Sequence, residues 1–197
     1  MRATIGAMTK DYRSLPPDLP VPQDDGAANH LPGMTMPAVR LASTLGGELD
    51  LAAASAGPSR LVAYVYPRTG VPGEPLIDGW NDIPGARGCT PQNAAFRDHI
   101  TDFSTLGVTI VGVSAQSPAE QAEFAARESI PFPLLSDDGF ELARTLRLPT
   151  FEAGGLTHYR RLTLVAREGA IEHVFYPVFP PDQNAVEVLE WLAFKSP

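Results

Sequence analysis

Short runs of apolar residues, each about the length of one strand, alternate along the chain with stretches of helical spacing. A continuous run that is rich in Val, Ile and Tyr is typical of a strand buried on both faces of a sheet. Leu61–Tyr66 (LVAYVY) is the clearest of these runs and predicts a central strand. The predicted strands are Leu61–Tyr66, Val108–Ser114, Phe132–Ser136, Tyr159–Arg167 and Ile171–Tyr176, the last two joined by a turn at Glu168 and Gly169.

Apolar residues three or four positions apart predict helices between these strands. The predicted helices are Cys89–Leu106, Ser117–Glu128, Asp137–Leu146 and Asp182–Phe194. Ser117 has the side chain of a helix cap, and Pro118 suits the first helical position, where a missing N–H costs nothing. Pro91 is tolerated for the same reason, which places Cys89 at or just before the N-terminus of its helix.

The remaining segments predict loops and a small hairpin. Residues 1–36 are rich in Pro, Asp, Asn and Gly, which favour turns, so we expect an N-terminal extension. Apolar pieces around Gly46 and Gly47 predict a hairpin, and Pro67–Gly88 is a loop of a length that is usually functional or disordered. The order of the elements predicts an α/β domain over residues 37–197, with a mixed sheet and helices on both faces.

Composition and charge narrow the classes of function. A chain of 197 residues is expected to form one domain, and its net charge of −8, without any basic run, disfavours binding to nucleic acid. Its longest apolar runs are far below the roughly 20 residues of a membrane helix, and Met1–Tyr12 lacks the apolar segment of a secretory signal. The short apolar runs also disfavour a membrane partner. With one cysteine, no internal disulfide can form, so we expect a cytoplasmic protein.

Cys89 is the first candidate for chemistry. A lone cysteine is most often a small buried apolar residue, and that interpretation stays open. However, Cys89 follows a Gly-rich loop (GARGC), lies at a helix N-terminus and has Arg87 two positions before it. The partial positive charge of a helix N-terminus stabilises a thiolate, which is the nucleophilic form of cysteine. This setting favours a reactive thiol, although we expect Arg87 itself to face solvent.

Four segments in this order resemble the peroxiredoxins, in particular the bacterioferritin-comigratory or Q-type branch of the AhpC/TSA superfamily. The segments read LVAYVYPRTG, GCTPQNAAFRDH, GVTIVGVSAQSPAEQAEFAARESIPFPLLSDDG and YRRLTLVAREGAIEHVFYP, and the resemblance as a whole covers about residues 37–192. The resemblance implies a thioredoxin-like fold and the reduction of peroxides, both hydrogen peroxide and organic hydroperoxides, by a cysteine thiolate. Phe96, on the helix of Cys89, is of a type that is more often a core residue, and it is also a candidate for an apolar collar that lets organic hydroperoxides approach.

The resemblance also implies roles for individual residues. Cys89 takes the place of the peroxidatic cysteine, and Arg161 that of the arginine that stabilises the thiolate and orients the peroxide. Arg160 and Arg161 are expected to alternate on a strand, so only one can face Cys89. The family's threonine, three residues before the cysteine, is replaced by Ala86. Thr69 matches the start of the motif instead, and residues 70–86 are then an insertion, so Thr69 is either the source of the active-site hydroxyl or a solvated loop residue.

Recycling of the cysteine departs from the family pattern as well. Many relatives carry a resolving cysteine five positions after the first, where this chain has Ala94. The resemblance therefore implies an external thiol reductant, such as a thioredoxin-like or glutaredoxin-like protein or a small molecule, and no cofactor. The scattered histidines disfavour a metal site. We expect a monomer or a weak homodimer.

Two rival functions remain open at this point. A non-enzymatic thioredoxin-fold protein, acting in redox sensing or in binding, would also lack the threonine and the resolving cysteine. A dithiol-disulfide oxidoreductase is disfavoured because such an enzyme needs two sulfurs and the chain has no CxxC motif.

Overall fold

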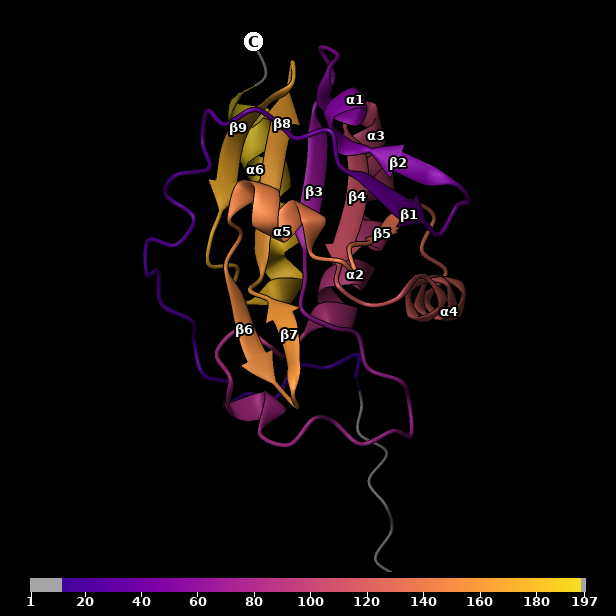
Figure 1. Ribbon diagram of the computed structural model, residues 1–197, viewed down its shortest axis with the longest axis vertical. Helices are drawn as coiled ribbons and strands as arrows, with labels where there is room; N and C mark the ends of the chain where they lie inside the picture. Colours follow the sequence, from indigo (N-terminus) through magenta and orange to yellow (C-terminus); the bar gives the residue numbers. More distant parts are fainter. Residues whose placement is uncertain (1–11, 196–197) are drawn as a thin grey trace, which may run out of the picture.

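A seven-stranded mixed sheet forms the centre of the computed structural model, which describes residues 12–195 (Figure 1). The strand order is β2-β1-β5-β4-β3-β8-β9, and β3 pairs in parallel with β4 and antiparallel with β8. The strands of this sheet are β1 Arg40–Ser43, β2 Glu48–Asp50, β3 Leu61–Val65, β4 Thr109–Ser114, β5 Leu134–Ser136, β8 Leu162–Arg167 and β9 Ala170–Phe175. The predicted α/β class with a mixed sheet is confirmed.

Strand β3 lies in the middle of the sheet because both of its faces are apolar. Its five residues are all buried, with Val62 and Tyr64 in one core cluster and Leu61, Ala63 and Val65 in the other. A strand covered on both sides has no solvent face to supply with polar residues. The continuous run therefore specified the position of this strand as well as its type.

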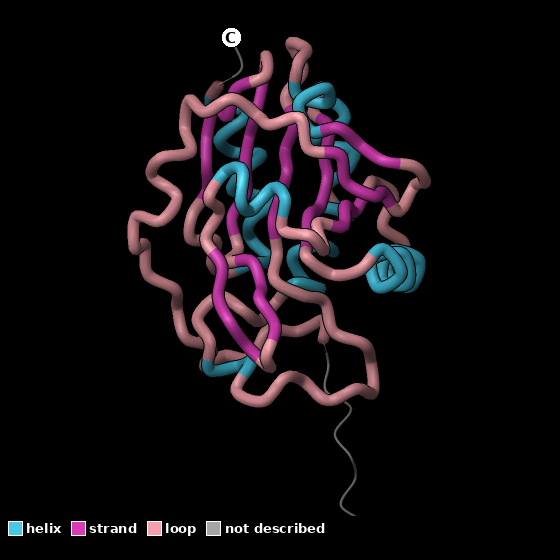
Figure 2. Tube along the Cα trace, viewed as in Figure 1, coloured by secondary structure: helices cyan, strands magenta, loops and turns pink. Residues whose placement is uncertain are grey.

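Helices cover both faces of the sheet. One core cluster includes residues of α1 and α5 together with the N-terminal segment, and the other includes residues of α2, α3, α4 and α6. The helices are α1 Leu51–Ser55, α2 Cys89–Asp98, α3 Ile100–Thr105, α4 Pro118–Glu128, α5 Glu141–Leu146 and α6 Asn184–Phe194, with 3-10 turns η1 Trp80–Asp82 and η2 Pro181–Gln183. Figure 2 shows how much of the remaining chain is loop.

Predictions that depend only on a few neighbouring residues, such as a helix start and a tight turn, are confirmed. Helix α4 begins at Pro118 and ends at Glu128, and its cap, Ser117, exchanges hydrogen bonds with Glu120 in a capping box. The turn between β8 and β9 places Glu168 and Gly169 at φ values of 54° and 75°. Such positive angles at both central residues suit the twist of a two-residue hairpin.

Two predicted helices were wrong in their extent. The helix predicted over Cys89–Leu106 divides at His99, where the backbone leaves helical geometry (φ −100°, ψ 10°) and α3 begins. The helix predicted from Asp137 begins only at Glu141. The side chain of Asp137 instead accepts hydrogen bonds from the main-chain N–H groups of Glu141 and Leu142, at 2.7 and 3.1 Å. Asp137 therefore satisfies the helix start from outside the helix.

The strand predicted over Tyr159–Arg167 is wrong because it joins two separate strands. A second, two-stranded sheet contains β6 (Thr150–Ala153) and β7 (Leu156–Tyr159), which sequence analysis missed, and β8 begins at Leu162. Arg160 and Arg161 connect β7 to β8 and belong to neither strand. The alternation expected of a strand therefore does not govern where these two arginines point.

Residues 12–36 run along the domain without helix or strand of their own (Figure 1). Leu31 and Met36 are buried in the core, and Thr35 forms an isolated bridge to Ala170 at the start of β9. The first eleven residues of the predicted extension lie outside the described residues, so the division at residue 36 stays a prediction. Over residues 12–195, no helix has the length and hydrophobicity needed to cross a membrane.

A glycine in the centre of β4 provides a test of the core. A Cβ on Gly112 would lie 2.6 Å from Leu134 Cδ2 and 2.7 Å from the hydroxyl of Tyr64, so we expect Gly112→Ala to destabilise the fold by about 1–3 kcal/mol. Urea denaturation measures the loss. Gly139→Ala is the matched control because no atom lies within 4 Å of its Cβ position, and it should be neutral or stabilising by up to about 1 kcal/mol. Equal stability of the two variants would contradict this account.

Candidate active site

Cys89 is the first residue of α2 and is 3% exposed. Gly88, directly before it, has a φ of 103°, which favours glycine. A Cβ on Gly88 would also lie 2.3 Å from Pro181 Cγ and 2.7 Å from Leu15 Cδ2. Pro181 and Leu15 therefore pack closely against the turn that leads into α2. Cys89 is at the N-terminus of this helix, as predicted.

Arg161, which lies directly before β8, contacts the sulfur of Cys89. Its Nη2 lies 3.2 Å from Cys89 Sγ and also donates to the main-chain carbonyls of residues 85–87 at 3.2–3.3 Å. Its Nη1 donates to Gln92 Oε1. Arg161 is 3% exposed, and no carboxylate among the described residues forms an ion pair with it. A thiolate at Cys89 is therefore placed to serve as the anion for this buried cation.

The thiol form and the thiolate form of Cys89 each find partners. The sulfur lies 3.4 Å from the main-chain N–H of Arg68 in addition to Arg161, so two donors face a thiolate. In the thiol form the S–H points to the carbonyl of Ala86 at 3.7 Å. Two donors beside the sulfur stabilise its thiolate form, which is the form suited to nucleophilic attack.

Thr69 is near this site, but no hydrogen bond joins its hydroxyl to the sulfur. Its main-chain N–H and its Oγ1 both donate to Gln116 Oε1, at 2.8 and 3.0 Å. Ser114, at the end of β4, donates to the carbonyl of Pro67 at 3.1 Å. The segment that carries the Arg68 N–H is therefore fixed to the end of β4 on both sides of Arg68. Thr69 is 3% exposed, so it is not a solvated loop residue.

Two neighbouring tyrosines lie beneath the site and stay neutral. Burial, and then the negative charge of Cys89, raise the pKa of Tyr66 far above its ordinary value. Burial likewise raises the pKa of Tyr64, and the nearby Tyr66 adds to the effect. Their hydroxyls donate to Gln121 Oε1 and Asn93 Oδ1, respectively. Neither tyrosine is therefore suited to act as a base for the thiol.

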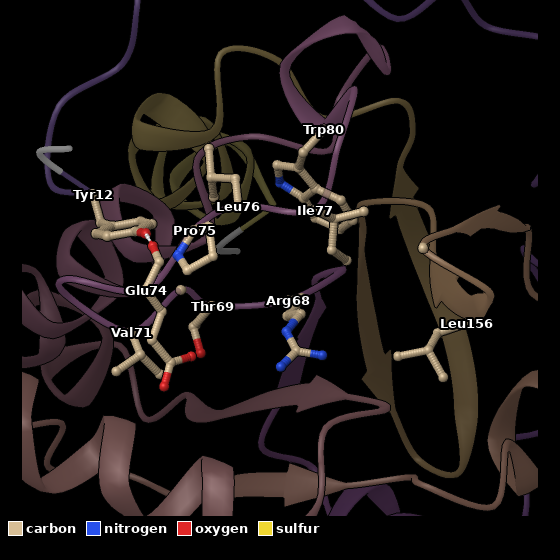
Figure 3. A pocket seen from close by; sticks show the side chains of 12 residues that line it. Tyr12, Arg68, Thr69, Val71, Glu74, Pro75, Leu76, Ile77, Trp80 and Leu156 are labelled. Carbon is tan, nitrogen blue, oxygen red and sulfur yellow. Dashed lines mark hydrogen bonds between the residues drawn. The ribbon is translucent and has the colours of Figure 1, made fainter.

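Two adjoining cavities lead toward Cys89. A cavity of about 20 Å³ is lined by Cys89 itself, and one of about 170 Å³ is lined by the inserted loop and the turn of the β6–β7 hairpin (Figure 3). Five residues line both cavities: Tyr12, Arg68, Gly70, Leu76 and Trp80. The loop over residues 70–86 therefore lines the approach to the thiol.

One expectation about the surroundings of Cys89 is wrong, and of the two alternatives for Phe96 the structure supports the core position. Arg87 does not face solvent, because it is 8% exposed and its guanidinium lies 5.3 Å above the ring of Tyr12. Phe96 does not form a collar at the opening. It is fully buried and stacks on Tyr64 at 4.2 Å between ring centres, as part of the core under α2. The apolar residues near the opening come from the insertion, which sequence analysis did not assign to the site.

Sequence reasoning also missed the buried amides that hold Arg161. Gln92 Oε1 accepts from Arg161, while Gln92 Nε2 donates to Asn184 Oδ1 at 2.9 Å, and the same oxygen accepts from Thr163 at 2.7 Å. Gln92 and Asn184 are both fully buried, although such side chains are mostly exposed. The one feature of the sequence that pointed to Gln92 as a site residue is its position in the first helical turn after Cys89. Within residues 12–195, no cluster of three or more His, Cys, Asp or Glu side chains is arranged to hold a metal ion.

Comparison with known families gives one match over residues 83–174, to the AhpC/TSA family. Among curated proteins, chloroplastic peroxiredoxin Q of Gentiana triflora is 28% identical over 120 residues, which cover 61% of this chain and 55% of that protein. Chloroplastic peroxiredoxin Q of Sedum lineare is 28% identical over 176 residues, covering 89% and 85%. The chain spans little more than half the length of most of the curated relatives it matches.

Solved structures show the same fold. Peroxidoxin BcpB from Mycobacterium tuberculosis superimposes with a TM-score of 0.68 at 23% identity, covering 85% of this chain and all of that one. Peroxiredoxin Q from Xanthomonas campestris superimposes with a TM-score of 0.64 at 23% identity, covering 84% and 97%. The expected thioredoxin-like fold is therefore confirmed.

Gln92 provides a test of the buried network. Gln92→Leu removes the acceptor of Arg161 Nη1 and the donor to Asn184 Oδ1, so we expect a loss of stability of about 1–3 kcal/mol from the unpaired groups. Chemical denaturation measures it. Gln183→Leu makes the same change at an exposed position without a side-chain cap bond, and it should stay within about 0.5 kcal/mol of the parent protein. If Gln92→Leu is equally neutral, the network does not hold the site.

Proposed function

We propose that this chain is a thiol-dependent peroxidase with Cys89 as its nucleophile, on the basis of its similarity to the AhpC/TSA family and to the peroxiredoxin Q proteins. The observation that supports this most strongly is the buried contact of 3.2 Å between Arg161 Nη2 and Cys89 Sγ. Burying a cation is unfavourable in free energy, and this one contacts the sulfur of the single cysteine in the chain. Hydrogen peroxide and organic hydroperoxides are the proposed substrates.

The proposed first step uses the sulfur and its two donors. The Cys89 thiolate attacks the distal oxygen of the peroxide, so that an S–O bond forms while the O–O bond breaks. The sulfur is oxidised by two electrons to a sulfenic acid, and the leaving oxygen takes a proton and departs as water or an alcohol. Arg161 stabilises the thiolate before attack and the negative charge on the leaving oxygen during it. Thr69 keeps the Arg68 N–H at the sulfur through Gln116.

The proposed recycling step requires a thiol from outside the chain, because Cys89 is the only cysteine and Ala94 stands where relatives carry the resolving one. A thiol of a thioredoxin-type or glutaredoxin-type reductant attacks the sulfenic sulfur and releases water, which leaves a mixed disulfide. A second thiol then breaks this disulfide and restores Cys89, and the two thiols leave joined to each other. Such a cycle needs a thiol pool, so we propose a reducing compartment such as the cytoplasm.

Removal of the sulfur tests the proposed function itself. We expect Cys89→Ser to abolish peroxide consumption with dithiothreitol as the electron donor, because a hydroxyl cannot form the sulfenic acid. In the parent protein, one equivalent of hydrogen peroxide should add one oxygen to the intact mass faster than it oxidises free cysteine. Oxidation no faster than that of free cysteine would favour the non-enzymatic alternative.

Arg161 and Arg160 form a matched pair of neighbouring arginines. Arg161→Met should lower the second-order rate of sulfenic acid formation by about 10²–10³-fold, the typical effect of losing one preorganised donor to developing negative charge. Stopped-flow measurement with hydrogen peroxide checks this. Arg160→Met removes the same charge one residue away, where Nε donates to the carbonyl of Thr150, and should change the rate less than twofold or so. Equal losses in the two variants would mean that net charge, not contact with the sulfur, is responsible.

A further inference from the structure

Tyr12 lies across the approach to Cys89, and three contacts hold its ring there. Its hydroxyl donates to the main-chain carbonyl of Glu74, the guanidinium of Arg87 lies 5.3 Å from its ring centre, and its ring covers Gly70. Tyr12 is 8% exposed although it belongs to a segment without helix or strand. The N-terminal segment therefore joins the inserted loop to the loop that precedes the cysteine.

We propose that Tyr12 determines which molecules reach Cys89 by size, and this proposal rests on the proposed peroxidase function. The cavity lined by Cys89 holds about 20 Å³, and a single water needs roughly 10–15 Å³. Space on this scale is suited to the two oxygens of a peroxide group. It excludes a thiol carried on a peptide or a protein. Tyr12 lines this cavity and also the one of about 170 Å³ beside it.

Of the three large polar or aromatic side chains shared by the two cavities, Arg68 and Trp80 are fixed to other parts of the domain, and Tyr12 belongs to the N-terminal segment. Arg68 pairs with Glu120 at 2.9 Å, and Trp80 packs against Phe151 and His158 of the β6–β7 hairpin. The segment of Tyr12 is also tied by an ion pair between Arg13, whose side chain is 70% exposed, and the buried Glu128. Because Tyr12 belongs to no helix or strand, displacing its ring opens the way to the sulfur without breaking the sheet or the helix of Cys89.

The two halves of the proposed catalytic cycle place different demands on this opening. Oxidation needs only a peroxide group at the sulfur, which the closed position of Tyr12 permits. Reduction needs the sulfur of an external thiol, with its carrier, to reach Cys89. The closed ring therefore admits the oxidant and delays the reductant, and its displacement is the step that admits bulky molecules.

Gly70 gives a second way to displace the ring without touching it. A Cβ on Gly70 would lie 2.4 Å from Tyr12 Cε1 and 2.6 Å from Cδ1, and the nearest atoms all belong to that ring. Gly70 does not have a positive φ, so alanine suits its backbone. Gly70→Ala should therefore force the Tyr12 ring out of its place, as Tyr12→Ala removes it.

The test compares a bulky reagent with a small one on the full chain. Fluorescein maleimide is used as the bulky thiol reagent and hydrogen peroxide as the small one. If the open state is populated at about 10% or less, Tyr12→Ala and Gly70→Ala should each raise the maleimide rate about tenfold or more. The hydrogen peroxide rate should change less than about threefold in both. The double variant should be no faster than Tyr12→Ala, because both changes act through the same ring.

Tyr176→Phe is the control for general loosening of the N-terminal segment. It removes the hydrogen bond of 2.9 Å from Tyr176 to Asp25 but leaves Tyr12 in place, so both rates should stay at the parent values. An unchanged maleimide rate in Tyr12→Ala and Gly70→Ala overturns the proposal. A parallel change in both rates also overturns it, because the ring would then act on the reactivity of the sulfur instead of on access. The maleimide rate does not depend on peroxidase activity, so a thiol that peroxide oxidises slowly would refute the proposed function alone.

Discussion

The buried guanidinium of Arg161 beside the sulfur of Cys89 is the constraint around which the site is built. Taking a cation out of water is unfavourable unless its N–H groups find acceptors. Here the carbonyls of residues 85–87, the amide oxygen of Gln92 and the sulfur supply acceptors for Nη1 and Nη2, whereas the buried Nε has no hydrogen-bond partner. The loop before α2 must therefore turn its carbonyls inward, and α2 must begin where it does, so that one cation fixes both the loop and the helix.

The sheet provides the alignment that makes this contact possible. Antiparallel pairing places Val65 of β3 opposite Leu162 of β8. Tyr66 follows Val65, and Arg161 precedes Leu162. Arg161 therefore lies at the same end of these two strands as the segment that carries the Arg68 N–H. A one-residue change of register would send the side chains of β8 to the opposite faces. The register of two core strands is thus a requirement of the chemistry as well as of the packing.

The sequence was informative where a structure depends on neighbours along the chain. The apolar run of β3 and the cap of α4 at Ser117 are local patterns, and both were predicted with their positions. The β6–β7 hairpin was missed because its strands are mostly exposed or half-buried and carry little apolar alternation. The burial of Arg87 and of Gln92 also could not be predicted, since each depends on a segment about 70 or more positions away, Tyr12 for the first and Arg161 for the second.

Loss of the resolving cysteine changes which part of the molecule has to move. Five residues along a helix turn through about 500°, so a cysteine at position 94 would lie on a different face from Cys89, and a disulfide between them would require α2 to unwind. With Ala94, no such bond forms, and α2 can stay folded. Its first turn is in fact anchored, because Asn93 donates to the Cys89 carbonyl and accepts from Tyr64. In the proposed cycle, access for an external thiol then depends on segments outside the helix, and the N-terminal segment at Tyr12 lies across the opening.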